Sequence, residues 1–490
     1  MGAVIGIDIG NSGCRISCVN GEGMPIPLLL DEGDVSLRYA VTEETINGEN
    51  CIFGGDITED LGYCEVKTLV KPKGTFADKC VSLCRDAEAE RAETIFREIL
   101  SEAIRRTEEL LCGERISGAV IACPPYYGAS LRRAFKEAAE AVKLSGGNCL
   151  NVVGLVDDVN ASVLSYLNST QLDGVKKVLA VDLGASLKAS VIDVRPTEKG
   201  ISIDQCASLG TTAFGGGAFN ELLKNYASNA YYDLTGDFLD GVWEDAFESR
   251  RLEKQIESAK RRLSKRSTAR ISVRYDGTKC DVEVQQSEFF KDCEGICLDA
   301  VKALEKELIA SGVSLSGLDG IFLTGGTASM PIIENVLSKY FGIPVTTFID
   351  DCAVANGAAI MAKALDKKDA ALKISQVCPY SIGIRAFCND EDVISNVVLK
   401  NTKLPLSESR TFATVYSDIP KLNLSLYENT STNDIISVKE CDSEESVLST
   451  IMDRGLPRGT VIDVTFTVDE NGIFEATVTD RVSNTEKKLV

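Results

Sequence analysis

Near its start the chain reads Ile5-Gly6-Ile7-Asp8-Ile9-Gly10-Asn11-Ser12-Gly13, and a related pattern returns in its middle as Val181-Asp182-Leu183-Gly184-Ala185-Ser186. In each copy a β-rich apolar run ends in Asp-x-Gly. This pattern is typical of a strand–turn–strand whose backbone N–H groups approach phosphates while a carboxylate stands beside a metal. A third glycine turn, Phe322-Leu323-Thr324-Gly325-Gly326-Thr327, precedes a helical run. Three such turns after strands, in this order, predict a nucleotide clamp with two lobes.

The composition excludes several classes of protein. The chain has 490 residues, of which 44% are hydrophobic and 26% charged, as expected for a globular protein of two or three domains. Its 52 Lys and Arg against 73 Asp and Glu give a formal net charge of −21, which disfavours direct binding to nucleic acid or anionic lipid. The absence of histidine removes Ser-His-Asp and Cys-His catalysis. The 17 cysteines form no Cys-x-x-Cys pair, so we expect reduced thiols and a cytoplasmic protein whose N-terminus is not a signal peptide.

Two patterns of periodicity divide the chain. Up to about residue 365, apolar strands alternate with helical segments, which predicts an α/β fold. Helices are expected near 86–112, 129–143, 216–232, 244–264, 289–311, 331–341 and 353–362. From residue 378 onward the helical period is lost, and short alternating strands predict an antiparallel β-sandwich. These strands are expected at 381–386, 411–415, 422–427, 461–468 and 474–478. Residues 428–449, rich in Ser, Asn, Asp and Glu, are expected to form a mobile loop.

With its motifs in this order, the chain resembles the heat shock protein 70 kDa family. Beyond the hairpins, Ile256–Ser264 is similar to the adenosine-binding helix of the family, and Phe322–Pro331 to its second adenosine segment. Its peptide-binding sandwich is matched by 400–405, 411–414, 427–428, 455–459 and 469–473. The resemblance implies an actin-like ATPase fold of duplicated ribonuclease-H-like lobes over 1–365, an interdomain linker over 366–378, and a peptide-binding-type β-sandwich over 379–490 without the family's helical lid.

In lacking the lid, the chain resembles the atypical, ribosome-associated members of the family, which pair with a zuotin-type J-domain protein. The resemblance therefore implies a cytoplasmic co-chaperone in a stable heterodimer with a J-domain partner. That partner would bring it to the ribosome, where it would assist a conventional 70 kDa chaperone on nascent chains, with no direct contact to nucleic acid or membrane. Two alternatives stay open. One is a conventional ATP-dependent peptide-binding chaperone with a slow ATPase; the other is an actin-fold kinase, which would leave the C-terminal strands unexplained.

The resemblance also assigns residues to the nucleotide site. Asp8 and Asp182 would hold Mg²⁺ through water, and Lys67, Asp158 and Asp182 would be the catalytic positions at the γ-phosphate. Contacts to ATP or ADP are expected from Asp8, Gly10, Asn11, Ser12, Gly184, Gly215, Gly216, Glu257, Lys260, Arg261, Ser264, Gly325, Gly326 and Asp351. Leu187 and Ala189 replace polar residues that the family places near the γ-phosphate, and phosphoryl transfer depends on positioning and electrostatics. We therefore expect ATP to be bound with little or no hydrolysis.

The C-terminal region has a second candidate site. The resemblance implies a peptide or partner pocket lined by Ile384, Phe387, Phe412, Leu422 and Leu424, although the same alternation equally predicts a sandwich core. The linker reads Ala370-Ala371-Leu372-Lys373-Ile374-Ser375 and lacks the leucine run flanked by aspartates with which the family's linker docks. We therefore expect the ATP-driven coupling of a conventional chaperone to be lost, although Pro124 and Arg132 match the family's interdomain relay.

Overall fold

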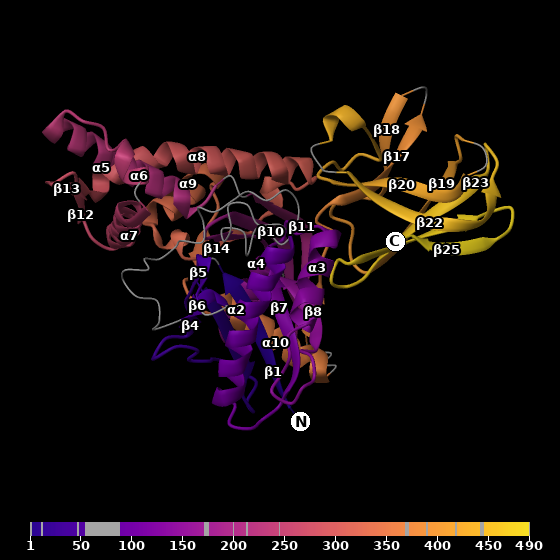
Figure 1. Ribbon diagram of the computed structural model, residues 1–490, viewed down its shortest axis with the longest axis horizontal. Helices are drawn as coiled ribbons and strands as arrows, with labels where there is room; N and C mark the ends of the chain where they lie inside the picture. The colour runs from indigo at the N-terminus through magenta and orange to yellow at the C-terminus, as the bar shows by residue number, and fades with distance from the viewer. Residues whose placement is uncertain are drawn as a thin grey trace.

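The computed structural model describes residues 2–489 except 11–12, 47–48, 54–88, 171–175, 199, 212–213, 245, 368–371, 389–390, 417–418 and 442–444. Two mixed α/β units are followed by a C-terminal unit of antiparallel sheets (Figure 1). Within the described residues, no helix is both long enough and apolar enough to cross a membrane.

The first α/β unit is built on a sheet of order β3-β2-β1-β7-β8, in which β4 also pairs with β2. β1 runs antiparallel to β2 and parallel to β7. Helices α2 and α3 pack their apolar residues against this sheet in one core cluster. The elements are β1 Ala3–Gly10, β2 Gly13–Val19, β3 Pro25–Pro27, β4 Ser36–Leu37, the hairpin β5 Tyr39–Ile46 and β6 Glu49–Phe53, α2 Ala89–Leu110, β7 Ile116–Cys123, α3 Ala129–Glu140 and β8 Val152–Asp157.

The second α/β unit has a sheet of order β15-β14-β9-β10-β11-β16. Here β9 runs antiparallel to β10 and parallel to β14, so both sheets centre on a hairpin with a parallel strand beside it. Its elements begin with α4 Asp158–Ser169, β9 Lys176–Leu183, β10 Leu187–Pro196, β11 Ile201–Thr211, α5 Gly216–Thr235, α6 Asp240–Glu244, α7 Ala246–Leu263, β12 Thr268–Tyr275 and β13 Thr278–Gln285. They continue with α8 Gln286–Ala310, η3 Leu315–Gly317, β14 Gly320–Thr324, η4 Thr327–Ser329, α9 Pro331–Phe341, β15 Val345–Thr347 and α10 Ala353–Lys367.

Glycines allow α10 to approach its neighbours at backbone distance. A Cβ atom on Gly6 of β1 would lie 2.0 Å from the amide nitrogen of Ala359, and one on Gly357 would lie 1.8 Å from the carbonyl oxygen of Ala161 in α4. These contacts hold α10 tightly against β1 and α4, so the helix joins the two α/β units. In Figure 1 it lies beside β1 and β7 of the first unit.

The C-terminal unit consists of a five-stranded sheet, β21-β18-β17-β20-β22, and a four-stranded sheet, β19-β23-β24-β25. Both sheets contribute to one apolar cluster that includes Ile382, Leu426, Val464 and Phe466. The strands are β17 Ser381–Cys388, β18 Glu391–Val398, β19 Leu406–Ala413, β20 Ile419–Asn429, β21 Ile435–Ser437, β22 Glu445–Leu456, β23 Val461–Val468, β24 Phe474–Asp480 and β25 Thr485–Leu489, with η5 Val438–Glu440. β20, β21, η5 and β22 occupy much of 428–449, so the expectation of one mobile loop there is wrong.

The segment expected to be an undocked linker forms a strand. β16, Leu372–Ser375, pairs in parallel with β11 from Ile201 to Asp204. Leu372 and Ile374 pack against the apolar cluster that contains Ile203. Pairing at a sheet edge needs only free backbone groups and alternating apolar side chains, both of which this segment supplies without a leucine run.

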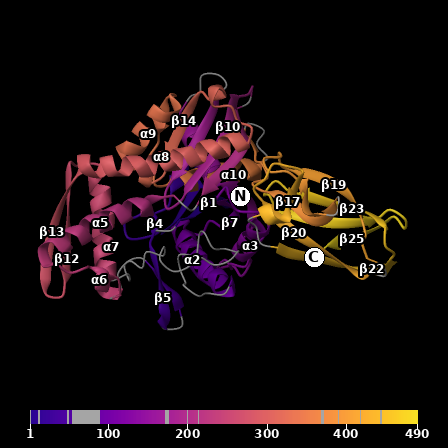
Figure 2. The same ribbon diagram turned by 90° about the horizontal axis from the view of Figure 1, so that it is seen from above.

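A buried polar network joins the C-terminal unit to the first α/β unit. Arg132 of α3, only 1% exposed, donates to Asp157 Oδ1 at 2.5 Å and to the carbonyl oxygen of Asn471 at 3.4 Å. Asn471 Oδ1 accepts a hydrogen bond from the Leu155 amide at 2.8 Å, and Gln376 Oε1 accepts one from the Asp157 amide at 3.0 Å. The turn between β23 and β24 is therefore fixed to the end of β8. Both views place the C-terminal sheets far from α7, β12 and β13 (Figures 1 and 2).

Candidate functional site

Each hairpin presents a buried aspartate opposite a cation. Asp8 of β1 is paired in register with Arg15 of β2, and Asp182 of β9 with Lys188 of β10. Asp8 Oδ2 lies 4.0 Å from Arg15 Nη1, and Asp182 Oδ2 accepts a hydrogen bond from Lys188 Nζ at 3.0 Å. Residues opposite one another in an antiparallel pair place their side chains on the same face of the sheet. The register of each hairpin thus produces the ion pair.

Lys188 also reaches a carboxylate from another part of the chain. Asp158 is the first residue of α4, directly after β8, and it is buried. Lys188 Nζ lies 2.7 Å from Asp158 Oδ2, and the lysine side chain is 17% exposed. Burial disfavours the charged ammonium, but Asp158 and Asp182 outweigh that effect and raise the pKa of Lys188 well above its ordinary value. A permanent cation therefore connects the second hairpin to the start of α4.

Glycine turns converge on Asp182. The Gly216 amide at the start of α5 donates to the carbonyl oxygen of Gly184 at 2.9 Å, and Thr327 Oγ1 donates to the same oxygen at 3.0 Å. Gly325 has φ +98°, and a Cβ atom there would lie 2.3 Å from Asp182 Oδ1. Only glycine combines this backbone conformation with such close approach. Turns from three parts of the sequence thus form a backbone cradle beside the carboxylate, as a bound nucleotide requires.

Helix α7 adds two charged side chains to this cradle. Lys260 is buried, with its Nζ 2.6 Å from Glu257 Oε2 and donating to the Gly216 carbonyl oxygen at 3.2 Å. Ser264 Oγ donates to the Lys260 carbonyl oxygen at 3.2 Å, within its own helix. Arg261 has a side chain 74% exposed and donates to Glu257 Oε1 at 3.1 Å. Of the four α7 residues in the sequence prediction, Glu257 and Lys260 are bonded into the site.

Of the remaining residues predicted to contact nucleotide, some lie at the ends of described elements and others lie outside the described residues. Gly10 ends β1, whereas Asn11, Ser12 and Lys67 lie outside the described residues. Asp351 is exposed before α10, next to Cys352, whose pKa burial and Asp350 raise to about 12. The charge of Asp8 also acts on this thiol, so the start of α10 lies beside the first hairpin.

Two further positions complete the glycine turns. A Cβ atom on Gly215 would lie 1.9 Å from the Ala185 carbonyl oxygen, which fixes the start of α5 against the second hairpin. Gly326 is exposed, and its carbonyl oxygen accepts from Ser329 Oγ at 2.8 Å. Ser329, which stands where the resemblance places a base-stacking arginine, is therefore turned to its own loop.

Leu187 and Ala189 flank Lys188 at the start of β10. Both are buried in the apolar core of the second unit together with Leu183. Because side chains alternate along β10, Lys188 takes the face that carries Asp182. Lys188 and Arg15 were not predicted from the sequence. In a hairpin, the residue paired with the aspartate follows from the length of the turn, so the strand register predicts Arg15 opposite Asp8 and Lys188 opposite Asp182.

The five residues of the expected C-terminal pocket differ in burial. Ile384 and Leu422 are buried in the cluster shared by the two sheets, and Phe412 and Leu424 are partly buried against it. Phe387, near the end of β17, is 61% exposed. Ile384 and Leu422 therefore lie in the core between the two sheets.

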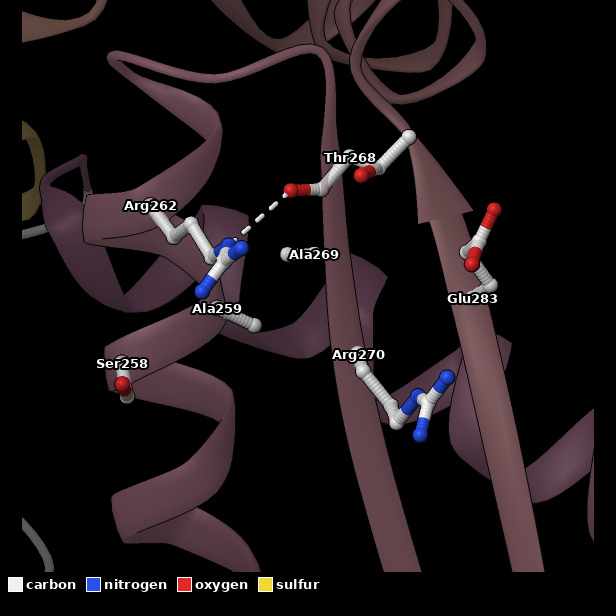
Figure 3. Close-up of a pocket in the computed structure, with 7 residues that line it drawn as sticks. All are labelled: Ser258, Ala259, Arg262, Thr268, Ala269, Arg270 and Glu283. Carbon is white, nitrogen blue, oxygen red and sulfur yellow. Dashed lines mark hydrogen bonds between the residues drawn. The ribbon is translucent and has the colours of Figure 1, made fainter.

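A cavity of about 350 Å³ lies between α7 and the β12–β13 hairpin (Figure 3). Its lining residues are Ser258, Ala259, Arg262, Thr268, Ala269, Arg270 and Glu283. Arg262 Nε donates to the Thr268 carbonyl oxygen at 3.2 Å across it. The lining includes no residue of the predicted nucleotide site, so this cavity is a separate feature.

A family model described as Hsp70 protein matches residues 73–490. The matched segment contains the second hairpin, α7, the third glycine turn and both C-terminal sheets, while the first hairpin precedes it. Hsp70 proteins are chaperones that bind nucleotide, use Mg²⁺ and work with co-chaperones, and mixed α/β content with several sheets fits their actin-like ATPase fold. Because the match covers most of its length, the chain belongs to the Hsp70 family.

Proposed function

We propose that this chain is an atypical Hsp70-type co-chaperone that binds ATP or ADP with little or no hydrolysis. The observation that carries this proposal is the 2.7 Å contact between Lys188 Nζ and Asp158 Oδ2. Asp158 occupies the position at which the family resemblance places the carboxylate that orients the attacking water. A carboxylate held by an ammonium is a weaker acceptor for that water, and phosphoryl transfer depends almost wholly on such positioning.

Nucleotide binding is supported by the cradle around Asp182. Gly184 has open space where a Cβ atom would stand, Gly216 and Gly325 let the neighbouring turns pack closely around Asp182, and Lys260 adds a buried cation beside Gly216. On this basis the two α/β units are proposed to be the duplicated lobes of an ATPase over 1–365. The two-sheet unit over 379–490 is proposed to be the peptide-binding-type β-sandwich.

The proposed partner is a J-domain protein in a stable cytoplasmic heterodimer, through which the chain acts at the ribosome beside a conventional Hsp70 on nascent chains. The five-stranded sheet supports a partner-binding role, because Phe387 is 61%, Val447 58% and Ile451 74% exposed. Val447 and Ile451 belong to β22, the last strand of that sheet. An exposed apolar edge can accept an extended segment by β-augmentation.

A second candidate, a conventional ATP-dependent chaperone with a slow ATPase, is favoured by one observation. β16 pairs with β11 of the second α/β unit, so the segment between the units is docked on the nucleotide-binding side. A docked connection can transmit a change between domains. The two candidates differ in whether ATP is hydrolysed.

Purified protein is expected to melt at a higher temperature when ATP or ADP is added, because a ligand bound only to the native state stabilises it. Saturation at 100 times the Kd corresponds to about 2.7 kcal/mol. Lys260→Met should lose most of the shift, whereas Lys279→Met, which removes the exposed pair with Asp281, should keep it. Differential scanning fluorimetry measures all three proteins. A folded wild-type protein with no shift at millimolar nucleotide would contradict the proposed binding.

A further inference from the structure

Both hairpins carry a built-in cation beside the carboxylate that the family resemblance assigns to Mg²⁺. Lys188 Nζ lies 3.0 Å from Asp182 Oδ2, and Arg15 Nη1 lies 4.0 Å from Asp8 Oδ2. The two pairs occupy equivalent places, each cation standing opposite its aspartate across an antiparallel turn. A cation therefore lies beside the aspartate in each of the two hairpins.

These residues do not fit a divalent ion. A hard cation such as Mg²⁺ is held through oxygen atoms of carboxylates, water and phosphate. Lys188 Nζ already lies 3.0 Å from Asp182 Oδ2, so a divalent ion bound to Asp182 would lie close to this ammonium. Two positive charges that close repel strongly where solvent is largely excluded. Across the described part of the chain, no group of three or more Cys, Asp or Glu side chains is arranged to hold a metal.

The same cations suit a phosphate chain. An ammonium has three donors, so Lys188 can contact a phosphate oxygen while it keeps Asp158 and Asp182. A guanidinium binds phosphate with two parallel donors, and Arg15 Nη1 lies 3.8 Å from the place where a Cβ atom on Gly10 would be, at the turn of the first hairpin. Both cations are thus positioned next to the glycine turns that would bind the phosphates.

We propose that Lys188 and Arg15 take the place of the divalent ion, so that this chain binds ATP or ADP in metal-free form. The inference rests on the nucleotide binding proposed above. Hsp70 proteins in general use Mg²⁺ with their nucleotide, and this chain would not. Hydrolysis measurements cannot detect that difference, because a site without ATPase activity gives no turnover with or without metal.

The test is calorimetric titration of ATP into the full chain, once in EDTA and once in excess MgCl₂. The wild-type Kd is expected to agree within about threefold between the two buffers. Lys188→Met should weaken binding in EDTA by at least about tenfold, because a charged partner of the phosphates is lost. Mg²⁺ should restore part of that loss, since Asp182 becomes available to a metal.

Lys188→Arg keeps the charge and should retain metal-free binding, and Lys279→Met is the control for loss of a lysine elsewhere. Circular dichroism establishes that each variant is folded, and Arg15→Met takes the place of Lys188→Met if that variant is not. Wild-type binding that requires Mg²⁺ would overturn this inference and leave the proposed function standing. Wild-type protein that binds ATP in neither buffer would overturn the proposed function itself.

Discussion

Arg132→Met is expected to lower the free energy of unfolding by about 3–5 kcal/mol, because removing one partner of a buried ion pair leaves the other charge uncompensated. Asp157, itself buried, would keep only side-chain and backbone hydrogen bonds such as that from Gln205 Nε2 at 2.8 Å. The contact to the turn at Asn471 would be lost as well. Urea unfolding followed by circular dichroism measures the change.

Two variants make this result specific. Arg385→Met removes an exposed arginine–aspartate pair of 2.8 Å with Asp392, and such surface pairs contribute about 1 kcal/mol or less. The double variant Arg132→Met with Asp157→Leu should recover part of the loss, because no buried charge remains. If Arg132→Met costs no more than Arg385→Met, the network does not hold the C-terminal unit in place.

Phe387→Asp is expected to weaken binding of a zuotin-type J-domain protein by at least about 30-fold, the effect typical of an apolar hot spot replaced by a charge. Its side chain is 61% exposed, so the fold should be unaffected. The ATP-dependent thermal shift should also persist, because the α/β units have cores of their own. Quantitative pull-down with the J-domain protein measures partner binding, and melting curves with and without ATP measure the thermal shift.

Val482→Asp is the matched control, because Val482 is 74% exposed and lies between β24 and β25 of the other sheet. It should bind the partner like the wild type. If Phe387→Asp is folded and binds equally well, the five-stranded sheet is not the partner surface. The interface would then have to be sought on the α/β units.

Local patterns in the sequence were sufficient to predict the hairpins at Asp8 and Asp182 and the helix that carries Glu257 and Lys260. Each depends on residues close together in the chain. The side-chain face of β10 was not predictable in the same way, because a shift of one residue in register exchanges the two faces of a strand. The sequence therefore identified Leu187 as unusual, whereas the structure places Lys188 beside the carboxylates.

Features that depend on distant partners were the ones missed. β16 is formed by pairing with β11, about 170 residues earlier in register, and nothing within 370–375 specifies that partner. Ile384 and Leu422 alternate with polar neighbours in the same way whether they line a pocket or face another sheet. Only the facing strands β19 and β23 decide between the two, and they lie elsewhere in the chain.

Single-turnover hydrolysis of ATP, with and without a J-domain protein, tests the central claim most directly. Lys188 engages Asp158 and Asp182, so hydrolysis is expected to stay near the rate of protein-free buffer and the J-domain is expected to produce no acceleration. The same preparation must first show the nucleotide-dependent thermal shift, so that a missing rate cannot be attributed to missing ligand. A readily measured rate that the J-domain stimulates would contradict the account and favour a conventional chaperone.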